Sequence, residues 1–121
     1  MSEWDWEEWQ REFRNHANRK AQDADDCRRK AAKGNVSYER FHDAELAEHI
    51  VASHLSTTAA LMSRDALIRE LRGYRESVAS GSNLYAAGTY RAADFRRQAI
   101  RYLDMLLKRL EDDPGSTMQE S

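Results

Sequence analysis

The chain has 121 residues, of which 40% are hydrophobic and 33% are charged, and its net charge is −2. This composition suits one small folded domain and excludes an intrinsically disordered chain. It also excludes a membrane span, because no apolar run approaches the ~20 residues that a span needs, and the near-neutral charge argues against nucleic acid as a partner.

The first predicted element is a long helix from about Ser2 to Lys33. Ser2 suits the N-cap position, and Asp5 would then lie in an acidic first turn. Gly34 follows the last helical residue, where glycine adopts the left-handed conformation that ends many helices. Because the chain holds one proline and few glycines, long helices are expected elsewhere too.

All three tryptophans of the chain lie near its N-terminus. The helical period places Trp6, Trp9 and Phe13 on one face, which continues into a seam of alanines, whereas Trp4 projects from nearly the opposite side. Chain ends are usually polar and frayed. We therefore expect these aromatic side chains either to pack into the core or to anchor a partner or a second subunit.

Three more helices are predicted after the first, at about 38–55, at about 59–79 and ending near Leu110. The segment 84–90 is predicted to be either a short helix or an irregular turn. The acidic residues 112–121 are predicted to form a disordered tail. The expected fold is all-α, an antiparallel bundle of about four helices with a long N-terminal helix, and residues 1–111 form its single domain.

Three single residues carry further predictions. Phe41 falls in the apolar arc of the second helix, so we expect it to be buried. Gly73 lies inside the third helix, where glycine costs about 1 kcal/mol relative to alanine, and it therefore indicates a close helix crossing. Cys27 is the single cysteine, which excludes an internal disulfide. Together with an acidic N-terminus unlike a signal peptide, it predicts a cytoplasmic location in a cell or an infected host cell.

Three residues of the second helix have the spacing of a metal site. His42, Glu45 and His49 share a face, and imidazole and carboxylate groups so spaced bind zinc or iron. Glu39-x-x-His42 resembles the motif of ferritin-like di-iron bundles, but those sites need two such pairs and two further glutamates. The chain has one pair, and the three residues lie away from the apolar arc, so a solvated face is the other interpretation.

Arg11 and His16 match the arginine-x4–6-histidine pattern of HEPN ribonucleases, which are helical and of similar size. The resemblance implies that His16 would act at the scissile phosphate and that Arg11 would stabilise charge. A pattern this short also arises by chance in a chain rich in arginine.

The last predicted helix carries a basic strip. Arg97, Arg101 and Lys108 share a face, and Asp104 is expected to pair with Lys108 four residues later. Such a strip is either a solvated face or a docking surface for an acidic protein.

Two stretches resemble known assembly proteins. Residues 84–93 resemble the turn of a tetratricopeptide hairpin, with its Gly-x-Tyr-x-x-Ala core at Gly88, Tyr90 and Ala93. The wider segment 67–110 resembles small head–tail joining proteins of tailed phages, although an extra alanine interrupts its Arg-Ala-Asp-like helix start. Both resemblances imply protein assembly and not catalysis.

Together these features predict a non-enzymatic interaction or assembly module without a cofactor: an adaptor, an inhibitor or a structural subunit of phage type. Its partner would be another protein or a second copy of the chain. The predicted contact residues are Trp4, Trp6, Trp9, Phe13, Arg97, Arg101 and Lys108. The alternatives are a metal-binding or hydrolytic bundle that uses His42, Glu45 and His49, and a HEPN-like ribonuclease that uses Arg11 and His16.

Overall fold

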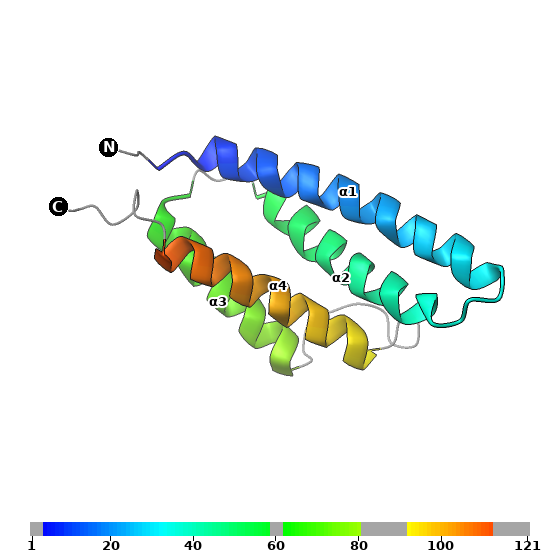
Figure 1. Cartoon of the computed structure of the whole chain (residues 1–121). Helices are drawn as coiled ribbons and strands as arrows, with labels where there is room; N and C mark the ends of the chain where they lie inside the picture. The colour runs from blue at the N-terminus through cyan, green and yellow to red at the C-terminus, as the bar shows by residue number, and fades with distance from the viewer. Residues whose placement is uncertain (1–3, 59–61, 81–91, 113–121) are drawn as a thin grey trace.

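The structure, a computed structural model, describes residues 4–58, 62–80 and 92–112. These residues form the helices α1 (Trp6–Ala32), α2 (Tyr38–Ser56), α3 (Arg64–Ser80) and α4 (Ala92–Asp112), and no strand occurs among them. Successive helices run in opposite directions (Figure 1). The prediction of an all-α antiparallel bundle with a long N-terminal helix is confirmed.

The helices pack as three neighbouring pairs. α1 lies along α2, α2 contacts α4, and α4 contacts α3. Each helix supplies apolar side chains to one core, whose largest fully buried members are Phe13, Val51, Leu55, Leu67, Leu71, Leu103 and Leu110. Burying one such side chain contributes about 1.5–3 kcal/mol. The apolar faces that the helical period predicts are therefore what holds the bundle together.

The first helix begins at a different residue from the predicted one. Asp5 is the N-cap: its backbone is extended, and its carboxylate accepts a hydrogen bond from the backbone N–H of Glu8 at 3.1 Å. Ser2 lies outside the described residues. At the other end, Gly34 has φ of +104°, a left-handed conformation that side-chain-bearing residues rarely adopt. The predicted stop at this glycine is confirmed.

The third helix begins later than predicted. α2 ends at Ser56 with Thr57 as its C-cap, and α3 begins only at Arg64. The hydroxyl of Ser63 accepts a hydrogen bond from the N–H of Ala66 at 3.1 Å. A serine in this role satisfies a free donor of the first turn and so fixes the start of a helix. The predicted helix start at about residue 59 is therefore wrong, because Met62 and Ser63 precede the helix.

Two packing predictions are also wrong. Phe41 is 54% exposed, because the α4 side chains that share its groove are all polar or charged: Asp94, Arg97, Gln98 and Arg101. Gly73 marks no close crossing, since a Cβ atom built there would meet nothing within 4 Å. Both positions follow the helical period, but the neighbouring helix does not cover them.

The C-terminal boundaries differ slightly from the prediction. α4 continues to Asp112, one residue into the predicted tail. The rest of that tail, 113–121, and the ambiguous segment 84–90 lie outside the described residues. Within the part of the chain that is described, no helix is long and apolar enough to cross a membrane.

Candidate functional site

The aromatic face of α1 is part of the protein's own core. Trp6, Trp9 and Phe13 are 3%, 8% and 2% exposed. The ring of Phe13 lies 6.4 Å from that of Trp6 and 5.9 Å from that of Trp9, measured between centroids. Because a partner could reach these side chains only by opening the core, we do not retain them as partner anchors.

Trp4 does not project from the opposite side of α1, as the helical period predicted. It precedes the N-cap, so the period does not apply to it. Its ring stacks on that of Trp9 with centroids 5.7 Å apart, and its Nε1–H donates to the carbonyl of Met62 at 2.5 Å. A hydrophobic residue before the N-cap that contacts the fourth helical residue is a hydrophobic staple. Trp4 is thus held by its own chain.

The three metal candidates of α2 have separate partners. The pairs are Nδ1 of His42 with Asp43 at 3.0 Å, Glu45 with Lys20 at 2.7 Å, and Nδ1 of His49 with the carbonyl of Ala17 at 2.8 Å. Among the described residues, no group of three or more histidine, cysteine or acidic side chains lies close enough to hold a metal ion. The structure therefore does not bring His42, Glu45 and His49 together.

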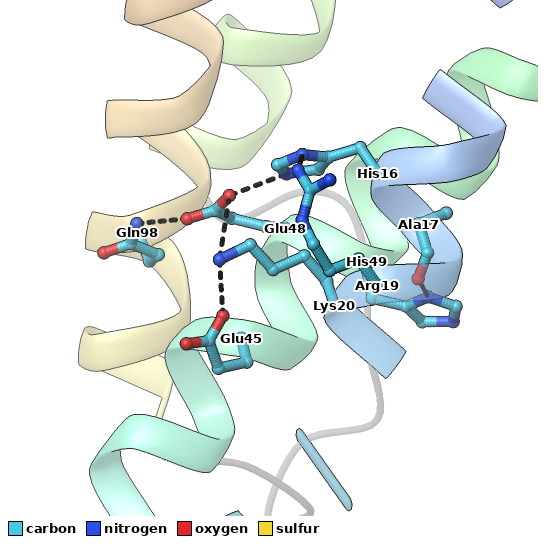
Figure 2. Close-up of polar contacts among 8 residues, drawn as sticks. All are labelled: His16, Ala17, Arg19, Lys20, Glu45, Glu48, His49 and Gln98. Carbon is cyan, nitrogen blue, oxygen red and sulfur yellow. Dashed lines mark hydrogen bonds and ion pairs between the residues drawn. The ribbon is translucent and has the colours of Figure 1, made fainter. Parts of the chain in front are cut away.

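Glu48 joins three helices through a polar network, shown in Figure 2. Its Oε1 lies 2.8 Å from Nε2 of His16 and 3.8 Å from Nζ of Lys20, both on α1. Its Oε2 accepts a hydrogen bond from the amide of Gln98 on α4 at 2.6 Å. Lys20 also donates to Glu45 at 2.7 Å. The side chain of Glu48 is 13% exposed, so this network lies partly inside the bundle.

The charges in this network stabilise one another. Burial raises the pKa of Glu48, but hydrogen bonds from His16 and Gln98 and the charge of Lys20 outweigh it and hold the pKa below its ordinary value. Burial lowers the pKa of Lys20, and the nearby Glu45 and Glu48 more than reverse this effect. Both groups are therefore charged at neutral pH.

His16 has a defined tautomer in this arrangement. Its Nδ1 lies 2.8 Å from Nη2 of Arg19. A guanidinium only donates, so Nδ1 accepts and carries no proton, and Nε2–H donates to Glu48. The ring of Tyr102 stacks on the imidazole with centroids 4.6 Å apart and planes 6° apart. The orientation of the His16 ring is thus fixed from three sides.

The HEPN-like pair is not brought together. Arg11 is exposed, and the contacts of His16 are with Arg19, Glu48 and Tyr102. Five residues of helix separate the two positions by about 140° around the axis. The geometry therefore gives Arg11 and His16 no shared site.

A second candidate site lies between α2 and α4. It is a groove of about 320 Å³, which we call the arginine groove. Its lining residues are Ser37, Arg40, Phe41, Ala44, Asp94, Arg97, Gln98 and Arg101. Three of these side chains are guanidinium groups and one is a carboxylate, so the groove has an excess of positive charge.

Asp94 gathers two of the three guanidinium groups. Arg40 donates to its two oxygens at 3.1 and 3.2 Å, and Arg97 donates at 3.0 Å. The hydrogen bond from Arg40 holds the pKa of Asp94 below its ordinary value. Arg101 makes no hydrogen bond or ion pair with the described part of the chain. Among the described residues, therefore, no carboxylate competes with an incoming group for Arg101.

The predicted strip on α4 is only partly in this groove. Arg97 and Arg101 line the arginine groove, but Lys108 does not. Lys108 pairs with Asp112 at 3.2 Å, and Asp104 pairs with Arg75 of α3. The predicted Asp104–Lys108 pair is therefore wrong, because Arg75 of the neighbouring helix binds the carboxylate of Asp104.

Sequence reasoning missed Arg40, Glu48 and Tyr102. Arg40 meets Asp94 across 54 positions of sequence, and Glu48 meets Gln98 across 50. No local signal in the chain links such distant positions. The adjacent basic and aromatic residues Arg40-Phe41 are the one local feature of the sequence that could have indicated the groove.

Comparisons of the chain with protein families, curated proteins and solved structures found no match. The tetratricopeptide-like turn lies almost wholly outside the described residues, and so does part of the segment that resembles the phage joining proteins. Function is therefore argued from the geometry and the charge of the arginine groove and of the network around Glu48.

Proposed function

We propose that this chain is a protein-interaction module whose arginine groove binds an acidic segment of a partner protein. The observation that carries the proposal is that Arg40, Arg97 and Arg101 line one groove together with a single carboxylate, Asp94, which bonds Arg40 and Arg97. Guanidinium groups match carboxylates in shape and form paired hydrogen bonds with them. The groove therefore favours a segment that carries several aspartates or glutamates.

Phe41 adds an apolar contact to this charged surface. It is 54% exposed, and its ring meets the edge of the Tyr38 ring at a centroid distance of 5.4 Å. Exposed ion pairs contribute only about 0–1 kcal/mol each, so charge alone does not give a stable complex. An aromatic side chain beside the charges supplies the buried contact on which most interfaces depend.

The helices also hold the groove in shape before a partner arrives. Arg40 belongs to α2 and Arg97 to α4, and their shared carboxylate fixes both. Fixing side chains in advance lowers the entropy lost on binding. An adaptor, an inhibitor or an assembly subunit would each use such a surface.

The test is binding of a short fluorescein-labelled peptide of alternating glutamate and phenylalanine, followed by fluorescence anisotropy. A peptide with glutamine in place of glutamate is the control ligand. We expect the glutamate peptide to bind more tightly and its affinity to fall with added salt. Arg101→Gln should weaken binding about two- to fivefold, and it should leave the fold intact because Arg101 has no partner among the described residues.

Arg14→Gln is the matched control variant, since Arg14 is exposed on α1 and lies outside the groove. It should leave the affinity unchanged. Equal binding of the two peptides, or equal losses in the two variants, would contradict the proposal. Sedimentation of the free protein adds a further check: if the groove is filled by a second copy, Arg101→Gln will convert an oligomer into a monomer, and the partner is then not a separate acidic protein.

A further inference from the structure

Gln98 belongs both to the arginine groove and to the network around Glu48. Its side chain lines the groove, and its Nε2 donates to Oε2 of Glu48 at 2.6 Å. It is half-buried on α4, between the exposed Arg97 and the buried Ala99. The amide of Gln98 therefore connects the interior of the bundle with the surface that we propose for the partner.

The orientation of this amide is fixed by Glu48. Although burial raises the pKa of Glu48, its hydrogen bonds from His16 and Gln98 hold that pKa below the ordinary value, so the carboxylate is ionised at neutral pH. An ionised carboxylate only accepts hydrogen bonds, so the NH2 group of Gln98 must face it. Turning the amide over would bring two acceptor oxygens together, which their like partial charges oppose.

This orientation leaves the carbonyl oxygen of Gln98, Oε1, as a free acceptor. It points away from Glu48 (Figure 2), and none of the described residues donates a hydrogen bond to it. Two guanidinium groups of the same groove, those of Arg40 and Arg97, donate to Asp94 instead. A ligand in the groove can therefore bond Oε1 without displacing a described side chain.

We propose that Oε1 of Gln98 accepts a hydrogen bond from a backbone N–H of an acidic segment that binds the arginine groove in an extended conformation. This inference rests on the proposed function, because it names the kind of segment that the same groove takes. The carboxylates of the segment bind the guanidinium groups, and one N–H between them bonds Gln98. Gln98 is then a specificity-determining residue, and Glu48 is a positioning residue that acts through it.

The free acceptor favours an extended segment over a helical one. Inside a helix, each backbone N–H is bonded to the carbonyl four residues earlier, so only the first turn has free donors. An extended segment keeps its N–H groups free. A segment that covered Oε1 without donating to it would leave a desolvated acceptor without a partner, which costs affinity.

The spacing of the arginines on α4 also suits an extended segment. Arg97 and Arg101 are four residues apart, which is about 6 Å along a helix axis. Alternate side chains of an extended chain point the same way and repeat about every 6.6 Å. Glutamates at every second position can therefore reach both guanidinium groups, while Gln98 lies between these arginines in the sequence of α4.

Ester substitution in the glutamate–phenylalanine peptide tests the inference. Replacing one backbone amide by an ester removes its N–H and changes the shape of the peptide little. Placed at each position in turn, an ester should weaken binding about two- to tenfold at one position, the range for the loss of one hydrogen bond. Fluorescence anisotropy measures the affinity. A peptide of the same composition that a staple holds helical should bind more weakly than the flexible peptide.

Variants of the protein locate the acceptor. Gln98→Met keeps the length of the side chain and removes Oε1, so it should bind the amide peptide and the sensitive ester equally. Glu48→Gln lets the amide of Gln98 turn over, because a glutamine donates as well as accepts, and the penalty for the ester should shrink. Gln22→Met, exposed on α1 and outside the groove, should leave the penalty unchanged.

The outcomes separate this inference from the proposed function. Failure of the all-amide peptide to bind would overturn both. If that peptide binds but no ester weakens it, if Gln98→Met keeps the ester penalty, or if the stapled peptide binds as tightly, the inference about Gln98 alone is overturned. An unchanged penalty in Glu48→Gln would overturn the positioning role of Glu48. Melting temperatures establish that the variants are folded, and the ester series on the unaltered chain needs no variant.

Discussion

The indole of Trp4 stacks on that of Trp9 at a centroid distance of 5.7 Å, although Trp4 precedes α1 and Trp9 lies inside it. With the hydrogen bond from Trp4 to the carbonyl of Met62, this contact joins the N-terminus to the connection between α2 and α3. The aromatic residues at the start of the chain therefore stabilise the fold.

Trp4→Ala should lower the free energy of unfolding by about 1–3 kcal/mol, because it removes the ring stacking, the buried area and one hydrogen bond. Urea denaturation measures the loss. Trp4→Phe is the control, since it keeps a stacked ring and removes the donor, and we expect a smaller loss. An unchanged midpoint for Trp4→Ala would show that the contact adds nothing to stability.

Two glycines should respond to alanine in opposite directions. Gly73→Ala should raise the free energy of unfolding by about 0.5–1 kcal/mol, because the position is inside α3 and a Cβ there meets nothing within 4 Å. Gly34→Ala should lower it by about 1 kcal/mol, since Gly34 has φ of +104°. Thermal unfolding of both variants checks the signs, and a stabilised Gly34→Ala would contradict the left-handed cap.

The network around Glu48 should make stability depend on pH in the acidic range. The pKa of Glu48 is lower in the folded state than in the unfolded state, so its contribution is present above the unfolded pKa, about 4.3. That contribution is lost as the pH falls through the folded pKa. We expect Glu48→Gln to show a flatter decline in stability than the unaltered chain below about pH 5.

Denaturation at a series of pH values measures this effect. Glu76→Gln, an exposed residue of α3, is the control and should keep the decline of the unaltered chain. Parallel curves for the unaltered chain and Glu48→Gln would mean that other carboxylates account for the acid sensitivity.

Asp94 should act as a competitor of the proposed partner in the arginine groove. Asp94→Asn removes the carboxylate that Arg40 and Arg97 bond. We expect the glutamate peptide to bind about three- to tenfold more tightly and to associate faster at low salt. Stopped-flow anisotropy measures both quantities, and weaker binding would show that the positioning of the two guanidiniums by Asp94 outweighs its competition with the peptide.

The features that local sequence determines were predictable. The helical period indicated the shared face of Trp6, Trp9 and Phe13, and Gly34 indicated the end of α1. These features depend on residues a few positions apart, so propensity and spacing specify them.

Features that depend on distant parts of the chain were not predictable. The exposure of Phe41 depends on which α4 residues face it, and the bond of His16 to Glu48 joins residues 32 positions apart. The predicted position of Trp4 is wrong for a local reason, because the helix starts at the residue after Asp5 and not earlier. A helical period applies only within the helix.

The hydrogen bond from Trp4 to Met62 spans 58 positions of sequence, and it holds Trp4 at the end of the bundle where Trp6 and Trp9 lie, so all three indoles of the chain are at one end. Intrinsic fluorescence therefore reports the unfolding of that end alone, whereas circular dichroism reports every helix. If the hairpin near Gly34 opens first, the ellipticity will change before the emission does. A comparison of the fluorescence and circular dichroism curves therefore shows whether the two ends of the bundle unfold in separate steps.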